Sequence, residues 1–142
     1  MLKLRTGFVF GKENTTPGTT SLLSETYTAH HDWIYLQLVY ENYFRSMGRF
    51  RLGWYNDLYY SNRDFFGSYT ATMLFANPFQ PLPEMSTLFM PQYRAHQYAG
   101  AGLKGLFLIR DNFDIRAEAY ICQPIREIVM GSSGIYATYG PW

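Results

Sequence analysis

The histidine, cysteine and acidic residues of this 142-residue chain offer little scope for a metal site. His30, His31 and Asp32 are consecutive, and consecutive residues of an extended strand point to opposite faces. The single Cys122 permits no internal disulfide, and no second cysteine or ordered histidine cluster gives metal-ligand spacing. We therefore interpret His30 to Asp32 as a solvated strand entry, and Cys122 as a small lining residue on a polar strand face.

A catalytic nucleophile is also hard to place. Many hydrolases hold their serine in a G-x-S-x-G turn between a strand and a helix, whereas residues 131–134 read Gly-Ser-Ser-Gly at the start of an expected strand. For His96, which follows Arg94 closely, packing is a simpler role than catalysis. Trp54, Tyr59 and Tyr60 could stack on a sugar, although anchoring at a membrane interface explains them with fewer assumptions. The sequence thus predicts no catalytic residue and no cofactor.

The elements that would position these residues are strands with two unlike faces. In the stretch GRFRLGWYNDLYYS, residues 48–61, the even positions carry mainly Phe, Leu, Trp and Tyr, and the odd positions carry Arg, Gly, Tyr and Asp. Side chains alternate across a strand, so one face is apolar and the other carries charge. A soluble sheet also alternates in this way, and the question is which face meets water.

About seven such strands are expected, and we find no convincing helix. A long loop at 12–31 is rich in Thr, Ser, Gly and Pro, and a second loop at 77–92 carries four prolines, which exclude a ladder or a helix. The predicted strands cover residues 2–11, 32–44, 48–61, 68–76, 93–110, 113–123 and 132–138.

Composition limits the class of protein. Charged residues make up 16% and the net charge is +1, so electrostatics does not indicate a nucleic-acid partner. Aromatic residues reach 19%, and these residue types favour strands and membrane interfaces. No apolar run approaches the length of a spanning helix, and the first residues lack the pattern of a signal peptide, so an export signal would lie elsewhere.

Strand length favours a membrane over water. Several predicted strands reach ten residues or more, near the length that crosses a bilayer at a tilt. Arg51, Asp57, Arg116 and Glu118 lie mid-strand on the polar faces, as in the lining of a barrel. We therefore expect an all-β, antiparallel, up-and-down transmembrane barrel segment, with the apolar faces toward lipid. The alternative is a soluble all-β binding module whose Tyr-rich face holds an apolar or sugar ligand.

Four segments carry a resemblance to a known family: HDWIYLQLVYENYF, FFGSYTATMLFANPFQPLPEMSTLF, PQYRAHQYAGAGL and AEAYICQP. They resemble the C-terminal outer-membrane barrel of patatin-like phospholipases from Bacteroidetes-type bacteria, within the BamA/TamA surface-antigen superfamily. The resemblance implies one domain over residues 1–142, part of a barrel of about sixteen strands, which anchors or helps to translocate an N-terminal lipase domain that this chain lacks.

The resemblance also suggests a role for Arg94. It implies that the Pro-rich loop folds back into the lumen, where many members of the superfamily place an Arg-Gly-aromatic motif against an acidic residue. Here Arg94 is followed by Ala95 rather than glycine. A buried arginine needs a carboxylate partner, and Glu118 and Asp114 on the lumenal face are the candidates; the alternative is that Arg94 is a solvated loop residue.

Two further expectations concern the barrel as a whole. The segment GIYATYGPW is similar to the strand and turn before the last two barrel strands of the family, so we read the chain as a fragment. Its expected partners are outer-membrane lipids, the rest of its barrel, an N-terminal domain and a second copy as a homodimer. Seven strands would place the loops at 12–31 and 77–92 at opposite ends of the barrel, so either a strand is miscounted or the first loop is unusual.

Overall fold

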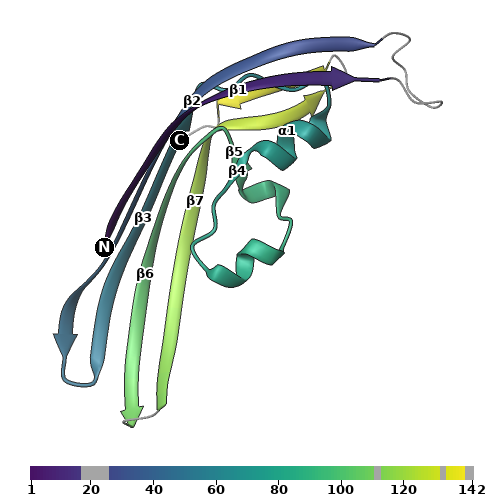
Figure 1. The fold of residues 1–142 in the computed structure, drawn as a ribbon. Coiled ribbons are helices and arrows are strands. Elements are labelled where there is room, and N and C mark those ends of the chain that lie inside the picture. Colours follow the sequence, from purple (N-terminus) through teal and green to yellow (C-terminus); the bar gives the residue numbers. More distant parts are fainter. Residues whose placement is uncertain (17–25, 111–112, 132–133, 140–142) are drawn as a thin grey trace.

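A computed structural model describes residues 1–16, 26–110, 113–131 and 134–139, and these form a mostly antiparallel β structure (Figure 1). One curved sheet has the strand order β1-β2-β3-β6-β7-β8, and its edge strands β1 and β8 do not pair with each other. The sheet is therefore open. Its strands are β1 (Leu2–Thr15), β2 (Tyr27–Met47), β3 (Phe50–Ser61), β6 (Gln97–Arg110), β7 (Phe113–Gly131) and β8 (Gly134–Tyr139).

Between β3 and β6 the chain leaves the sheet and folds over one of its faces (Figure 1). We call residues 62–96 the covering segment. Its strands β4 and β5 pair with each other, Asn77 lying opposite Ala95. The elements of the segment are α1 (Tyr69–Phe75), β4 (Asn77–Pro78), the 3₁₀ helices η1 (Pro83–Thr87) and η2 (Pro91–Tyr93), and β5 (Arg94–Ala95).

The predicted strand at 68–76 was wrong, because most of it is helix α1. Thr72 stabilises the first turn of α1 with two hydrogen bonds. Its backbone N–H donates to Ser68 O at 2.9 Å, and its Oγ1 accepts from Phe66 N at 3.0 Å. β3 and β6 pair directly along their length, so the sheet has no place for this piece between them. The prediction that prolines exclude a helix at 77–92 was also wrong. Prolines begin both η1 and η2, where a missing N–H costs nothing.

Without the predicted strand at 68–76, the two long connections no longer fall at opposite ends of the sheet. β1 ends and β2 begins at the same end of the sheet at which β3 ends and β6 begins, so the connection after β1 and the covering segment share one end. The short connections after β2 and β6 lie at the other end. The predicted loop at 12–31 was too long, since β1 runs to Thr15 and β2 begins at Tyr27; residues 17–25 lie outside the described part.

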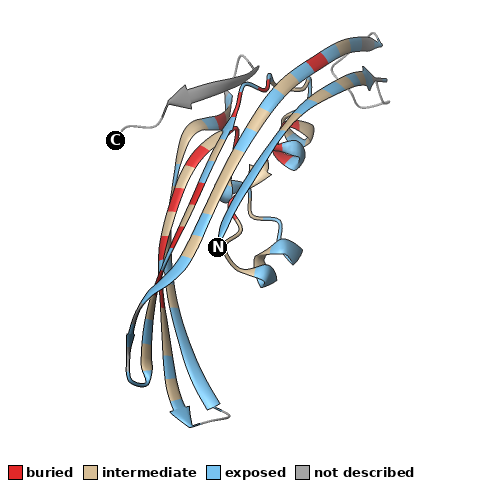
Figure 2. Cartoon of the chain, turned by 60° about the vertical axis from the view of Figure 1, so that its left-hand side comes forward, coloured by how far each residue is buried: buried red, intermediate tan, exposed pale blue. Residues whose placement is uncertain are grey.

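The two faces of the sheet differ as the alternation predicts. On β3, Trp54 and Leu58 are 39% and 47% exposed, whereas Tyr55 and Asp57 on the other face are 6% and 2% exposed. Buried positions cluster on the side of the covering segment, and the long lower part of the sheet is largely exposed (Figure 2). The bare apolar face carries Leu4, Phe8, Ile34, Leu36, Leu58, Leu103, Phe107, Ile115 and Ile121.

None of the helices in the described part of the chain has the length and apolar character needed to cross a membrane.

Candidate functional site: the covered polar face

A hydrogen-bonded network around Asp57 joins the sheet to the covering segment. The Asp57 carboxylate accepts from Gln37 Nε2 at 3.0 Å and from the Tyr98 hydroxyl at 3.2 Å. The Tyr98 oxygen in turn accepts from Asn77 Nδ2, at 2.8 Å, in the covering segment. These residues come from β2, β3, β6 and β4. A buried carboxylate is costly unless it is hydrogen-bonded, so this network fixes where the segment sits.

Phe79 fastens the same region by packing. It is 2% exposed and contacts the rings of Tyr55 and Tyr98. Its ring lies directly on Gly100 of β6, where an added Cβ would lie 2.1 Å from Phe79 Cε2. Position 100 therefore requires glycine for close approach. Residues 99–102 are Ala-Gly-Ala-Gly, but no local pattern indicates what packs on them, because Phe79 lies in the Pro-rich stretch.

Arg94 has other partners than those expected from the resemblance. Its Nη1 donates to the carbonyl oxygens of Met73, Leu74 and Ala76 at 3.2, 2.8 and 3.0 Å. These carbonyls belong to the end of α1, where helix carbonyls lack intrahelical partners. Arg94 is half-buried, so it is not a solvated loop residue either.

The predicted carboxylate partners of Arg94 lie elsewhere, and neither pairs with it among the ion pairs of the described residues. Glu118 accepts from the Tyr120 hydroxyl at 2.7 Å and lies 3.7 Å from Arg116 Nε. Asp114 is exposed and lies opposite Leu108, at the far end of the sheet from Arg94. The carbonyls of α1, which was not predicted, take the place of the carboxylate.

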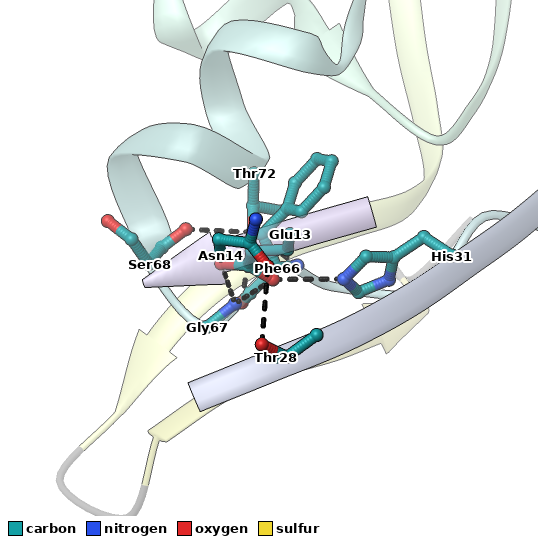
Figure 3. Close-up of polar contacts among 8 residues, drawn as sticks. All are labelled: Glu13, Asn14, Thr28, His31, Phe66, Gly67, Ser68 and Thr72. Carbon is teal, nitrogen blue, oxygen red and sulfur yellow. Dashed lines mark hydrogen bonds and ion pairs between the residues drawn. The ribbon is translucent and has the colours of Figure 1, made fainter. Parts of the chain in front are cut away.

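Glu13 fixes the start of α1 to the edge of the sheet (Figure 3). Its carboxylate accepts from Gly67 N at 3.0 Å and lies 2.9 Å from His31 Nε2. His31 is buried, whereas His30 and Asp32 are exposed on strand β2. The prediction that the adjacent histidines point to opposite faces is confirmed, but His31 is not solvated. No group of three or more potential metal ligands occurs among the described residues.

Glu13 itself was missed because the first strand was predicted to end at residue 11. The alternation of β1 continues, however, and it places Glu13 on the same face as Val9 and Gly11. That continuing pattern was the signal available in the sequence.

The aromatic residues considered for sugar stacking, and Cys122, are divided between the two faces of the sheet. Trp54 and Tyr60 are exposed on the apolar face, whereas Tyr59 is half-buried and stacks on Tyr98 of the polar face. The three rings therefore do not form one sugar-stacking platform. Cys122 is half-buried against the cluster that contains Phe79, as expected of a small residue on the polar face.

His96 is buried where the covering segment meets the sheet. It is 1% exposed, and its ring stacks on Phe65 with 5.4 Å between centroids. Burial, and then the charges of Arg126 and Arg63, lower the pKa of His96 to about 4. The imidazole is therefore neutral at pH 7, and protonation is opposed by its surroundings.

Acidification should loosen the covering segment through His96. In the unfolded chain the pKa of a histidine is about 6.5, and in the folded protein that of His96 is about 4. Between these two pH values the unfolded state therefore binds more protons than the folded state. Stability therefore falls as the pH drops through this window, by on the order of 3 kcal/mol. Hydrogen exchange of the segment from pH 7.5 to 4.5 measures the loss. His96→Phe, which keeps the stacking, should flatten the slope; an unchanged slope would refute the assignment.

A cavity of about 380 Å³ separates the first three strands from the turn after β4. Lys3, Arg5, Gln37, Glu41 and Asp57 line it, and Lys104 Nζ lies 2.7 Å from Glu41 Oε1 at its side. The lining holds charges of both signs and no serine or cysteine nucleophile next to a base. The covered face is thus polar, with a hollow beside the covering segment.

Comparison of the chain with protein-family models, with curated proteins and with solved structures finds no match in any of the three.

Proposed function

We propose that this chain forms part of a transmembrane β-barrel of the bacterial outer membrane, with its bare apolar face against lipid and its covering segment inside the lumen. The observation that carries the proposal is the burial pattern of the sheet, in which apolar side chains are exposed and charged ones are buried. Leu58 and its apolar neighbours are exposed, while Asp57 and Lys104 on the other face are buried. A water-soluble sheet packs its apolar face and wets its charged one.

Strand dimensions and connections support the same proposal. The sheet strands β1, β2, β3, β6 and β7 have 12 to 21 residues, more than a tilted strand needs to cross a bilayer. The two long connections, after β1 and between β3 and β6, lie at one end of the sheet, as in outer-membrane barrels. The short connections after β2 and β6 lie at the other end, and the two-residue connection between β7 and β8 lies at the first. The edges of β1 and β8 are unpaired, and hydrocarbon cannot satisfy them, so the barrel must include further strands, from one polypeptide or from a second copy.

Within this class we propose a surface-antigen barrel of the patatin-like phospholipase type, which anchors or helps to translocate an N-terminal lipase domain. The support is the resemblance of the four sequence segments, together with a covering segment at the position of the Pro-rich loop. The proposed partners are outer-membrane lipids and the remaining strands. A soluble binding module is disfavoured because nothing in the described structure packs on the apolar face.

Solubility of the 142-residue chain tests the membrane proposal. In water the chain should aggregate through its apolar face, whereas detergent micelles should keep it dispersed with the circular dichroism of a β protein. A variant that combines Leu36→Lys, Leu58→Lys, Ile115→Lys and Ile121→Lys should need less detergent to stay dispersed, because these four side chains are exposed on that face. Recovery of the unmodified chain from water as a folded monomer would contradict the proposal.

A further inference from the structure

A second cavity on the covered face, of about 310 Å³, lies between strands β1 to β3 and the end of α1. Its lining differs from that of the first cavity. It includes two arginines, Arg5 and Arg63, and the rings of Trp33, Tyr35 and Tyr59, but no carboxylate. Its size is at the small end of the range for ligand pockets.

Arg63 is buried without enough partners. It is 4% exposed, and only Nη1 has a hydrogen bond, to Phe75 O at 2.6 Å. Nε and Nη2 have no hydrogen-bond partner, and Arg63 makes no ion pair among the described residues. Unpaired buried donors of a charged group are costly, and native structures rarely leave them so. These two nitrogens are shielded from solvent, so an anion in the cavity would interact with the charge of the guanidinium as a whole.

The guanidinium of Arg63 is held in place before any ligand arrives. Its Cζ lies 4.2 Å from the centroid of the Trp33 ring and 4.4 Å from that of Phe66. Burial lowers the pKa of Arg63 to about 10, so it remains charged at pH 7. A fixed, desolvated cation binds an anion more strongly than a mobile surface cation does.

The remaining walls suit a ring rather than a bare ion. Tyr35 and Tyr59 lie nearly parallel, with 6.5 Å between centroids and 25° between planes. Gln37 adds a polar group to the lining. Arg5 supplies the second positive charge. The carboxylate of Asp57 lines the neighbouring cavity instead, where Gln37 and Tyr98 hydrogen-bond to it.

We propose that this cavity binds a water-soluble anionic monosaccharide, such as a sugar phosphate, with its anionic group between Arg5 and Arg63 and its ring against the tyrosines. A water-soluble ligand fits because the cavity lies on the polar face, under the covering segment and away from the bare apolar face. The proposal concerns the polar face alone and does not require that the other face meets lipid.

The site is tested by isothermal titration calorimetry on the full-length protein in detergent micelles. Glucose 6-phosphate is the probe, with glucose and inorganic phosphate as comparisons. We expect a Kd of about 1 mM or below for glucose 6-phosphate, and binding at least tenfold weaker for each comparison, which corresponds to about 1.4 kcal/mol.

Arg5→Gln is the test variant, because Arg63 also holds Phe75 and its loss could unfold the segment. Arg5 is exposed, and no hydrogen bond of its side chain is seen. The Arg5→Gln variant should weaken binding at least tenfold. The control is Arg51→Gln, which changes an exposed arginine of β3 that does not line the cavity, and it should change binding less than twofold.

Three results would overturn the proposal: no binding of glucose 6-phosphate, equal losses in both variants, or inorganic phosphate binding as tightly as the sugar phosphate. Circular dichroism must show the same fold for both variants. Solubility in water is measured separately, so a failure of sugar binding and a failure of the membrane proposal are distinguishable.

Discussion

Leu58→Arg should prevent the protein from assembling in a membrane. Leu58 of β3 lies between Leu38, which is near the middle of β2, and Ala99 on β6, and its side chain is 47% exposed on the bare apolar face. An arginine that faces lipid at the middle of a bilayer costs about 2–4 kcal/mol. The measurement is the fraction of the gene-encoded protein that stays in the outer-membrane fraction after a urea wash, which we expect to fall at least tenfold.

The control for this experiment is Gln92→Arg. Gln92 is exposed in η2 of the covering segment, so the same side chain is added away from the sheet. Its membrane fraction should match that of the unmodified protein. Equal retention of the Leu58→Arg variant would show that the apolar face does not meet lipid.

Gly100→Val should release the covering segment from the sheet. A Cβ at this position would lie 2.1 Å from Phe79 Cε2 and 2.8 Å from two further ring atoms, so Phe79 must leave its site. Expelling a buried phenylalanine costs about 3–5 kcal/mol, to judge from truncations of such residues. Limited proteolysis between α1 and η2, with the protein in detergent, should therefore become at least tenfold faster.

Two controls separate release of the segment from general damage to β6. In Gly105→Ala the nearest heavy atom to the new Cβ is 3.4 Å away, an ordinary contact, so proteolysis should stay within twofold. In the double variant Phe79→Ala with Gly100→Val, the second change should add little to the first, because the clashing ring is already gone. Additive effects would show that Gly100 acts through something other than Phe79.

The sequence predicted the strands well where their pattern was local. Side-chain alternation in β3 and β7 follows from the backbone itself, and the strands predicted at 48–61 and 113–123 are present. β3 begins two residues later than predicted, at Phe50, and β7 continues to Gly131. The faces of Trp54, Tyr55, Asp57 and Leu58 are as predicted. The ends of the strands were less predictable. β1 and β2 extend through Thr, Asn and His, which are as common in loops, and only their pairing makes them strands.

Helix α1 marks the limit of local reasoning. Tyr69, Thr70 and Thr72 favour strands, and the prediction followed that preference. β3 and β6 pair with each other, however, so the segment has no strand beside it, and it satisfies its backbone internally as a helix. The polar contacts of Arg94 then changed as well, because the carbonyls that it binds exist as free acceptors only at the end of that helix.

The sequence by itself determined that this protein is built of long strands with one apolar and one charged face, because alternation is a property of each strand alone. The tertiary structure decided what covers each face. Asn77 reaches Tyr98, Glu13 reaches Gly67 and Phe79 reaches Gly100 across 21, 54 and 21 positions. Such contacts leave no periodic trace, since they depend on how the chain returns to the sheet, and they bury the charged face while the apolar one stays bare.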